Sequence, residues 1–431
     1  MRLLIRLICL FLIFFIIVWP TKYIIAKPLE LSEAIKIALT SHPSINAADA
    51  IFKAESLSIT PLYFPENPKI GIMSENNLKS WTLSQELSFP SKYYYRGLIQ
   101  KQRSLFFRED VIIKKLQLRG RVISTYYELF QREKTLELLG MQKELLTEIA
   151  RIAETLRTVG KTTIQDEMRA HLEQAKIENE ILVAEQDVIQ SKAKIKELLE
   201  NATEDTEKIQ LPALKKPKLT VTIKQLRALF QSLSTTSTIS STSTSSSLEA
   251  LAPSLKLISW QVAEANAQKD LANSSYWPDL EFSYQQSLER DIDDKKIFLG
   301  LKIPLWFLGK ENFDSNAAAA KVVSAQKNLE TSKRELQSTL RALSSKMEAK
   351  ENILNLYSST LIPQGVSIIN SSRSAYKAGR INFLEILESE RTVYQLKTTY
   401  YQELKEYAET IAEIESNLGQ SISSIPFEGV L

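Results

Sequence analysis

The chain has 431 residues, of which 44% are hydrophobic and 24% charged, with 54 basic and 51 acidic side chains. A net charge of +3 is too small to indicate a nucleic-acid partner. The single cysteine, Cys9, excludes a disulfide framework and a thiolate metal site. His42 and His171 are the only histidines and lie far apart in sequence, so no metal site is expected.

No catalytic pattern stands out along the chain. There is no phosphate-binding glycine loop, no nucleophile elbow and no cluster of metal ligands. Aspartates and glutamates are instead spread along polar helical stretches. The sequence therefore predicts a protein that is not an enzyme and needs no cofactor.

The amino terminus has the pattern of a secretory signal. Met1–Arg6 is a basic start, an apolar run follows over Leu7–Trp19, and Ala26 is a suitable cleavage point. The run is too short to span a bilayer comfortably. Removing residues 1–26 takes away Arg2, Arg6 and Lys22 but no acidic residue, which leaves 51 basic against 51 acidic groups.

The remaining chain contains the same pattern twice. His42-Pro43-Ser44-Ile45 is repeated as Ala252-Pro253-Ser254-Leu255, and Asn67-Pro68-Lys69-Ile70 as Trp277-Pro278-Asp279-Leu280. Val159-Gly160-Lys161 likewise corresponds to Ala378-Gly379-Arg380. One structural unit has been duplicated.

Each repeat contains one pair of alternating strands. The pairs are expected over 69–89 and 279–303, with polar turns at 76–80 and 289–296. Strands of about 7 to 9 residues with one apolar face approach the length of a transmembrane barrel strand, although a soluble sheet has the same alternation. Four strands cannot close a membrane pore, so a barrel requires several subunits. Tyr93–Tyr95 follow and are expected either at a membrane interface or in helix packing.

Long helical hairpins make up the rest of each repeat. No proline interrupts residues 91–211, and a helical arm of nearly seventy residues extends about 100 Å. Its heptad positions are Leu145, Ile149, Ile152, Leu156 and Val159, and those of the return arm are Met168, Leu172, Ala175, Leu182 and Ile189, with Asn179 and Gln186 as polar interruptions. The second hairpin runs over 310–377, with a kink at Pro363, turns at Gly379 and returns over 383–418.

These elements predict a domain plan. Residues 1–26 form the signal, 27–231 the first repeat with its tip at Gly160, and 248–420 the second repeat with its tip at Gly379. A serine- and threonine-rich linker over 232–247 joins them, and 421–431 form a tail.

Several motifs resemble one family. Leu31–Leu39 followed by His42-Pro43 looks like the opening of the TolC-type outer-membrane efflux proteins, and Ala375–Gly379 with Leu387–Arg391 resembles their second hairpin tip. Gln85–Lys92 is similar to the strand-to-helix passage of the heavy-metal (cobalt-zinc-cadmium) branch, in which glycine usually stands at the position of Ser91. The resemblance covers essentially the whole chain after the signal.

The resemblance implies a mostly α fold with a small β part. Three subunits of a homotrimer would contribute twelve strands to an outer-membrane β-barrel and twelve helices to a periplasmic α-barrel. Such a channel passively conducts substrates delivered by a periplasmic adaptor and an inner-membrane pump, expected to be of the RND type. The expected location is the outer membrane, with a long periplasmic extension, and the exported substrate stays open.

The resemblance also points to residues at the hairpin tips. Glu385 and Glu388 share one helical face after Gly379, and Asp166 holds the corresponding position after the first tip. In a trimer each would form a ring of three carboxylates, an arrangement that favours cations and can gate the pore. The alternative is that they are solvated charges of a helix face. The turns that would contact an adaptor are Val159, Gly160, Lys161, Ala378, Gly379 and Arg380.

Two other classes share some of these features. A periplasmic adaptor carries a signal and a coiled-coil hairpin, but it has one hairpin between small β-domains. A coiled-coil scaffold explains the heptads but not the strand pairs at matching positions of the two repeats.

Overall fold

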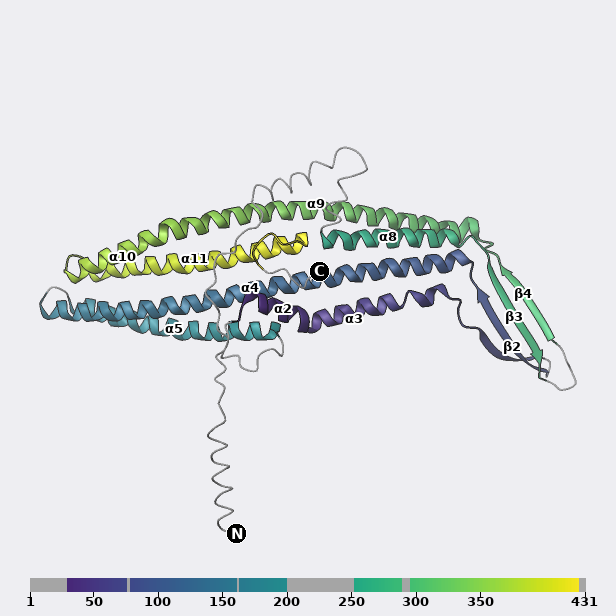
Figure 1. The fold of residues 1–431 in the computed structure, drawn as a ribbon, viewed down its shortest axis with the longest axis horizontal. Helices are drawn as coiled ribbons and strands as arrows, with labels where there is room; N and C mark the ends of the chain where they lie inside the picture. Colours follow the sequence, from purple (N-terminus) through teal and green to yellow (C-terminus); the bar gives the residue numbers. More distant parts are fainter. Residues whose placement is uncertain (1–28, 76–77, 161–162, 200–251, 289–294, 426–431) are drawn as a thin grey trace, which may run out of the picture.

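The computed structural model describes residues 29–75, 78–160, 163–199, 252–288 and 295–425. The molecule is elongated, with a β-sheet at one end and two helical tips at the other (Figure 1). The expected signal over 1–26, the linker over 232–247, Lys161 and most of the tail lie outside the described residues. Among the described helices, none is both long and apolar enough to cross a membrane.

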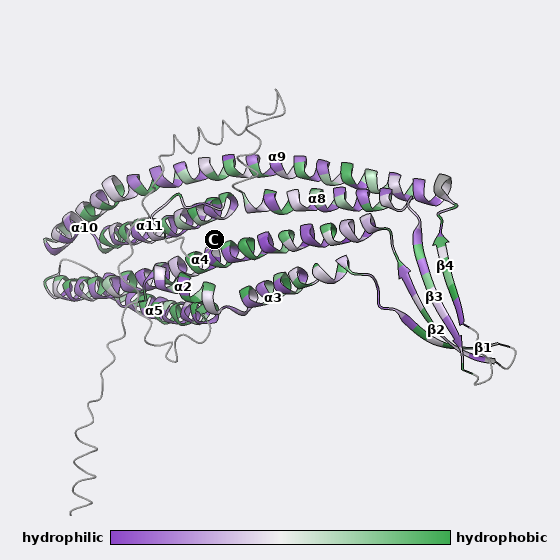
Figure 2. Ribbon diagram, turned by 45° about the vertical axis from the view of Figure 1, so that its right-hand side comes forward, coloured by the Kyte–Doolittle hydropathy of each residue, from purple (hydrophilic) through white to green (hydrophobic). Residues whose placement is uncertain are grey.

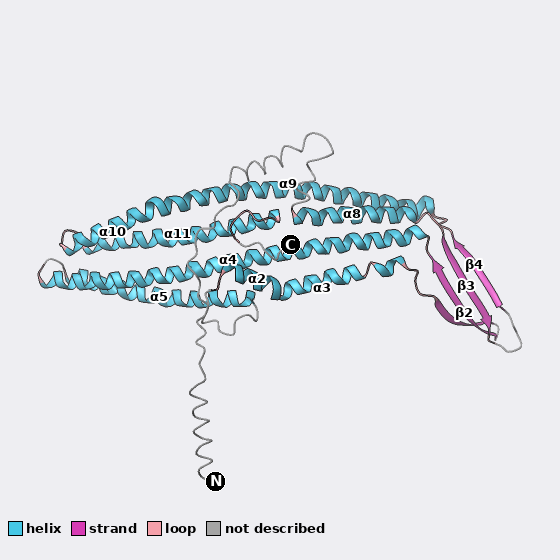
Figure 3. Ribbon diagram, in the orientation of Figure 1, coloured by secondary structure: helices cyan, strands magenta, loops and turns pink. Residues whose placement is uncertain are grey.

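Both repeats have the predicted order of helix, strand pair and helical hairpin (Figure 3). The elements of the first repeat are α2 (Leu31–Ser41), α3 (Pro43–Leu57), a 3-10 turn (Thr60–Tyr63), β1 (Lys69–Glu75), β2 (Leu78–Leu87), α4 (Pro90–Thr158) and α5 (Ile164–Leu199). Those of the second are α8 (Pro253–Ser274), β3 (Asp279–Ser287), β4 (Lys295–Lys302), α9 (Asn312–Leu356), α10 (Ile362–Lys377) and α11 (Phe383–Leu418). Proline starts α3, α4 and α8, because its missing N–H costs nothing at the first position of a helix.

The long arm of the second repeat changes geometry next to Pro363. One turn of π-helix over Tyr357–Leu361 separates α9 from α10 and ends two residues before this proline. Proline cannot donate to the carbonyl four residues earlier, and a widened turn accommodates the lost hydrogen bond. The structure therefore has a π-helical turn close to the position where the sequence predicts a kink.

The four strands form one antiparallel sheet in the order β1-β2-β3-β4. Two strands begin slightly earlier than predicted, β2 at Leu78 and β4 at Lys295. The two repeats join through β2 and β3, where Leu83 lies opposite Tyr284 and Leu87 opposite Leu280. Sequence analysis gave each strand pair but not this junction between them.

The sheet has one apolar and one mostly polar face. Because directly opposed residues lie on the same face, Ile70, Leu83, Tyr284 and Ile297 form one continuous apolar row across all four strands. Ile70 is 76% exposed and Leu299 79%. Figure 2 shows the hydrophobic stretch of β4 in green. Phe298 is an apolar exception on the opposite face, where it lies over Gly300.

The helices form an extended layer that runs from the sheet to the tips. Near the sheet α4 packs between α3 and α8, and towards the tips it packs between α5 and α11 (Figure 1). One hydrophobic core lies in the middle of the molecule, around Leu118, Ile123, Tyr407 and Ile411. A second core lies between the two hairpins near their tips.

The packing seam of α5 differs from the predicted one. The side chains that face α4 include Ala170, Ile177, Ala184 and Ser191, which repeat every seven residues. The predicted heptad positions are exposed instead, as the exposed fractions of Met168 (66%), Leu172 (56%), Leu182 (62%) and Ile189 (58%) show. The helix carries two seven-residue patterns, and the buried one contains the small residues Ala170 and Ala184. We call the exposed set, Met168, Leu172, Leu182 and Ile189, the α5 stripe.

A buried ion pair fixes the end of α11. Arg119 Nη2 lies 2.8 Å from Glu415 Oε2, and both side chains are almost fully buried. The other carboxylate oxygen accepts hydrogen bonds from the backbone N–H groups of Ile422 and Ser423 and from the Ser423 hydroxyl. Glu415 therefore holds the segment after Gly419 against α4 and α11.

Candidate functional site

Glycine closes both hairpin tips. Gly160 and Gly379 have φ angles of 73° and 66°, a left-handed conformation that L side chains rarely adopt. At the second tip, Gly379 N donates to Tyr376 O at 2.9 Å and Arg380 N to Ala375 O at 2.9 Å. These bonds satisfy the last carbonyls of α10, as helix ends require.

The residues predicted to contact an adaptor lie at these tips. Val159, Gly160, Ala378, Gly379 and Arg380 are exposed at the end of the molecule remote from the sheet. Their position leaves them accessible, and their contact with an adaptor stays a prediction.

Glu385 and Glu388 line one groove between α10 and α11. Its volume is about 480 Å³, and Ile368, Ser372 and Thr392 also line it. Asn382 positions this face of α11, because its side chain caps the helix by accepting the N–H of Glu385 at 2.9 Å. Both carboxylates are exposed, and neither forms an ion pair with a described residue. The groove therefore brings two of the predicted gate residues together.

Asp166 lies apart from that groove, at the start of α5. Its backbone N–H donates to Thr163 Oγ1 at 3.3 Å, and its carboxylate accepts from the same hydroxyl at 3.0 Å. Burial, with a smaller contribution from the Asp166 charge, raises the pKa of Tyr376 to about 12. Thr163 thus caps α5 at the N–H of Asp166, and the Asp166 carboxylate lies close enough to Tyr376 of the second hairpin to affect its pKa.

Ion pairs near the tips join the two hairpins. Glu148 of α4 contacts Arg373 at 2.9 Å and Lys377 at 2.7 Å, both on α10. The hydrogen bond from Lys377 is the largest cause of a lowered pKa of Glu148. Glu173 of α5 contacts Arg391 of α11 at 2.9 Å. Sequence reasoning missed these pairs because charged residues are frequent along all four helices.

A second contact between the hairpins is buried. Gln142 Nε2 of α4 donates to Glu390 Oε2 of α11 at 2.7 Å, and the two residues are 6% and 5% exposed. Burial raises the pKa of Glu390 to about 7, which the hydrogen bond from Gln142 opposes. In the sequence, the only sign of this contact is that Gln142 and Glu390 are polar residues among apolar neighbours.

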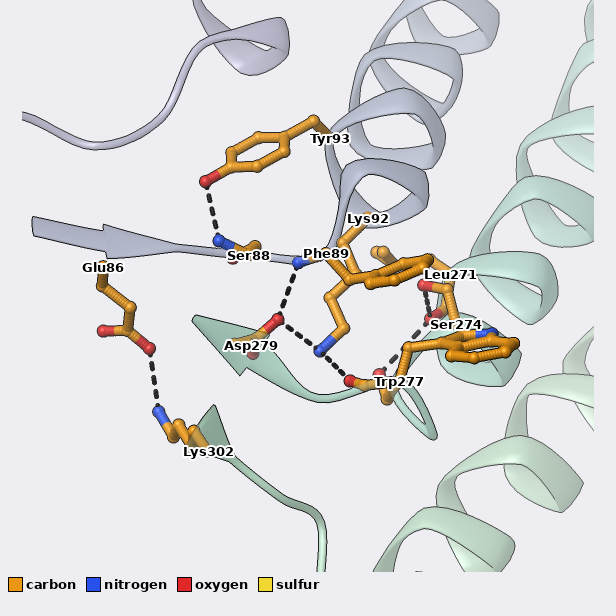
Figure 4. Close-up of polar contacts among 11 residues, drawn as sticks. Glu86, Ser88, Phe89, Lys92, Tyr93, Leu271, Ser274, Trp277, Asp279 and Lys302 are labelled. Atoms are coloured by element: carbon orange, nitrogen blue, oxygen red, sulfur yellow. Dashed lines mark hydrogen bonds and ion pairs between the residues drawn. The ribbon is translucent and has the colours of Figure 1, made fainter. Parts of the chain in front are cut away.

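A polar joint connects the sheet with the helices (Figure 4). Lys92 Nζ donates to Asp279 Oδ1 at 2.7 Å and to the backbone carbonyl of Trp277 at 2.9 Å. Phe89 N donates to the same carboxylate oxygen at 2.9 Å, and the Phe89 ring stacks on Trp277 with centroids 5.0 Å apart. The joint binds the end of β2 in the first repeat to the start of β3 in the second.

The tyrosines after Pro90 differ in their surroundings. The Tyr93 hydroxyl accepts the N–H of Ser88 at 2.9 Å and so helps to hold this joint (Figure 4). Tyr94 is 55% exposed and remains available for a membrane interface. His42 directly precedes α3 and caps the start of that helix, because its ring Nδ1 accepts the Ser44 N–H at 3.2 Å.

Comparison with known proteins supports the resemblance found in the sequence. Residues 244–420 match the family described as outer membrane efflux protein. The cobalt-zinc-cadmium resistance protein CzcC of Cupriavidus metallidurans is 20% identical over 383 residues, which cover 86% of this chain and 85% of CzcC.

Solved structures show the same fold. The outer membrane protein VceC of Vibrio cholerae has a TM-score of 0.72 at 14% identity, over 91% of this chain and 96% of VceC. The CmeC outer membrane channel of Campylobacter jejuni has a TM-score of 0.71 at 14% identity, over 92% of this chain and 87% of CmeC. The predicted fold class is confirmed, and the matched proteins are channels and efflux proteins rather than enzymes.

Proposed function

We propose that this protein is the exit duct of a tripartite efflux system, because residues 244–420 match the outer membrane efflux protein family and the chain has the fold of solved outer-membrane channels. It would conduct substrates passively across the outer membrane, the location that these comparisons support. A periplasmic adaptor and an inner-membrane pump, of the RND type in this proposal, would deliver them.

The sheet is the observation that carries this proposal. Its apolar face is exposed, and within the described residues β1 and β4 are each paired on one side only. Open edges and a bare apolar face are unfavourable in water, but copies joined edge to edge form a closed barrel whose apolar face meets lipid. Three copies supply twelve strands, and the polar face then lines the pore.

The helices support the same assembly. Towards the tips, α5 lies at one edge of the layer and α9 and α10 at the other. The α5 stripe is uncovered at its edge. In a ring of three subunits it would pack on the α9–α10 edge of the next copy, which closes a helical tunnel below the barrel. An adaptor or scaffold would not need such a sheet or stripe.

The tip groove supports a gate at the periplasmic end. Glu385 and Glu388 lie on one exposed face, so each would form a ring of three carboxylates if this face lines the tunnel. Asp166, at the other tip, would add a third and weaker element. Because CzcC is a cobalt-zinc-cadmium resistance protein, cobalt, zinc and cadmium ions are the first substrates to test.

The test is single-channel conductance of the detergent-purified protein in a planar bilayer. We expect small, cation-selective openings that enlarge in Glu385→Ala/Glu388→Ala, while Glu413→Ala, an exposed glutamate elsewhere on α11, behaves like the wild type. Unchanged conductance in the double variant would contradict the proposed gate but not the proposed channel. A protein that stays soluble without detergent and forms no channel would contradict the exit-duct function.

A further inference from the structure

Glu390 lies where the second hairpin meets the first. Its helix, α11, packs on α4, and Glu390 and its partner Gln142 are both more than nine-tenths buried. Apolar side chains lie beside them, among them Ile369 and Val393, which line the same cleft. A carboxyl group in such a place is costly as an anion, because burial removes water and one amide N–H replaces only part of its hydration.

Gln142 is incompletely satisfied as well. Its Nε2 donates to Glu390, but its buried Oε1 has no hydrogen-bond partner. A protonated Glu390 supplies the missing donor, because a carboxylic acid and an amide can exchange two hydrogen bonds in a closed pair. An ionised Glu390 has acceptors only and leaves Oε1 unsatisfied.

Protons and water have access to this contact. A cleft of about 340 Å³ opens beside it between α4, α10 and α11, and both Gln142 and Glu390 line it. The cleft is also lined by Met141 of α4 and Asn370 of α10, which lie on opposite hairpins.

The charges around Glu390 do not neutralise it. From α5, the carboxylates of Glu173 and Glu180 repel its anion. Arg391 attracts the anion but is paired with Glu173, and Arg373 of α10 is paired with Glu148. Lys397 and Tyr394 of α11 complete the polar lining of the cleft. Burial is the largest influence and raises the pKa of Glu390 to about 7.

We propose that Glu390 and Gln142 form a proton-dependent latch that holds the two hairpins together when Glu390 is neutral and releases them when it ionises. The latch involves no bond other than hydrogen bonds, and the proton exchanges with water in the cleft. Its consequence for conduction rests on the proposed exit-duct function: the tips of the duct would separate more readily in alkaline than in acidic periplasm.

The test measures the separation of the hairpins directly. Cysteines replace Met141 and Asn370, both exposed and on opposite sides of the cleft, and spin labels on them report the distance between α4 and α10 from pH 5.5 to 8.5. The labels can be placed selectively, because the native Cys9 lies in the expected signal. Three proteins are compared: the otherwise native protein, Glu390→Gln, and Glu413→Gln as an exposed control on the same helix.

We expect the label distance to increase with a midpoint near pH 7 in the native and Glu413→Gln proteins. Glu390→Gln keeps a neutral amide at the contact and should hold the short distance at every pH. A native distance that does not change, or a Glu390→Gln profile equal to the native one, would overturn the latch.

Conductance recorded over the same pH range separates this proposal from the exit-duct function. Labels that respond as expected in a protein that forms no channel support the latch and contradict the duct. Channels in a protein whose labels do not respond contradict the latch and leave the duct in place.

Discussion

Lys92 and Asp279 form a 2.7 Å ion pair that joins the two repeats at the point where helices give way to the sheet. Their side chains are 9% and 17% exposed, and Asp279 also accepts the N–H of Phe89. The pair therefore links the start of α4 to the start of β3 (Figure 4).

Replacing Lys92 by methionine should destabilise the protein by about 3 kcal/mol or more, because it leaves a nearly buried carboxylate with a single backbone donor. Thermal unfolding of the purified protein checks this. Lys302→Met is the matched control, since the Lys302–Glu86 pair is exposed and should contribute less than about 1 kcal/mol. Equal losses of unfolding free energy in the two variants would show that the Lys92–Asp279 pair contributes no more than an exposed ion pair.

The two faces of the sheet should differ in their tolerance of charge. Leu299→Lys places an ammonium group on the apolar face and should cost about 2 to 4 kcal/mol if that face meets lipid. Ser283→Lys, on the opposite face and directly cross-strand from Phe298, should be tolerated in a water-filled pore. The amount of folded protein in the outer-membrane fraction measures both, and equal yields would contradict the assigned orientation.

The α5 stripe should be required for assembly. Glutamates in place of Met168 and Leu172 should shift the protein from trimer towards monomer, because they put charge into a surface that a neighbouring copy is proposed to cover. Exchange of the same residues for other apolar ones, Met168→Leu and Leu172→Met, should leave the trimer intact. Analytical ultracentrifugation in detergent distinguishes these results, and a stable trimer of the glutamate variant would remove the stripe from the interface.

The sequence predicted the parts of this fold that depend on local signals. Prolines mark the starts of α3, α4 and α8, and Gly160 and Gly379 mark the tips, because few other residues suit those backbone conformations. Alternation located all four strands to within a few residues.

The parts that depend on distant contacts could not be predicted. The seam of α5 was assigned to the larger apolar residues, whereas Ala170 and Ala184 lie in the real one, because a helix with two seven-residue patterns does not reveal which faces its neighbour. Gln142 and Glu390 stand 248 positions apart, and nothing local indicates that they meet. Glu385 and Glu388 could be predicted to lie together because they share one helix, and they do line one groove. The proposed ring of carboxylates depends on contacts between three copies of the chain, which a single chain does not contain.

Stability near neutral pH should depend on Glu390. Its pKa is about 7 in the folded protein against an ordinary 4.5, so the folded form binds a proton more strongly than the unfolded form. The stabilisation is fully present below about pH 4.5 and is lost as pH rises to about 7, at up to ~1.4 kcal/mol per pH unit. Thermal unfolding at pH 5 and pH 7 should therefore show a smaller decrease for Glu390→Gln than for the wild type. Identical decreases would mean that Glu390 titrates at its ordinary pKa.

Glu415 should be the most sensitive carboxylate outside the tips. Glu415→Gln keeps the shape of the side chain but removes the charge that faces buried Arg119, whose own pKa burial already lowers. Removing the negative charge that faces this buried guanidinium should cost about 3 to 5 kcal/mol. The segment from Ile422 to Ser423 should also loosen, because its backbone N–H groups donate to the same carboxylate. Amide hydrogen exchange of these two residues, together with thermal unfolding, measures both effects. Glu413→Gln, exposed on the same helix, should change neither; protection retained in Glu415→Gln would show that the segment is held by its apolar contacts alone.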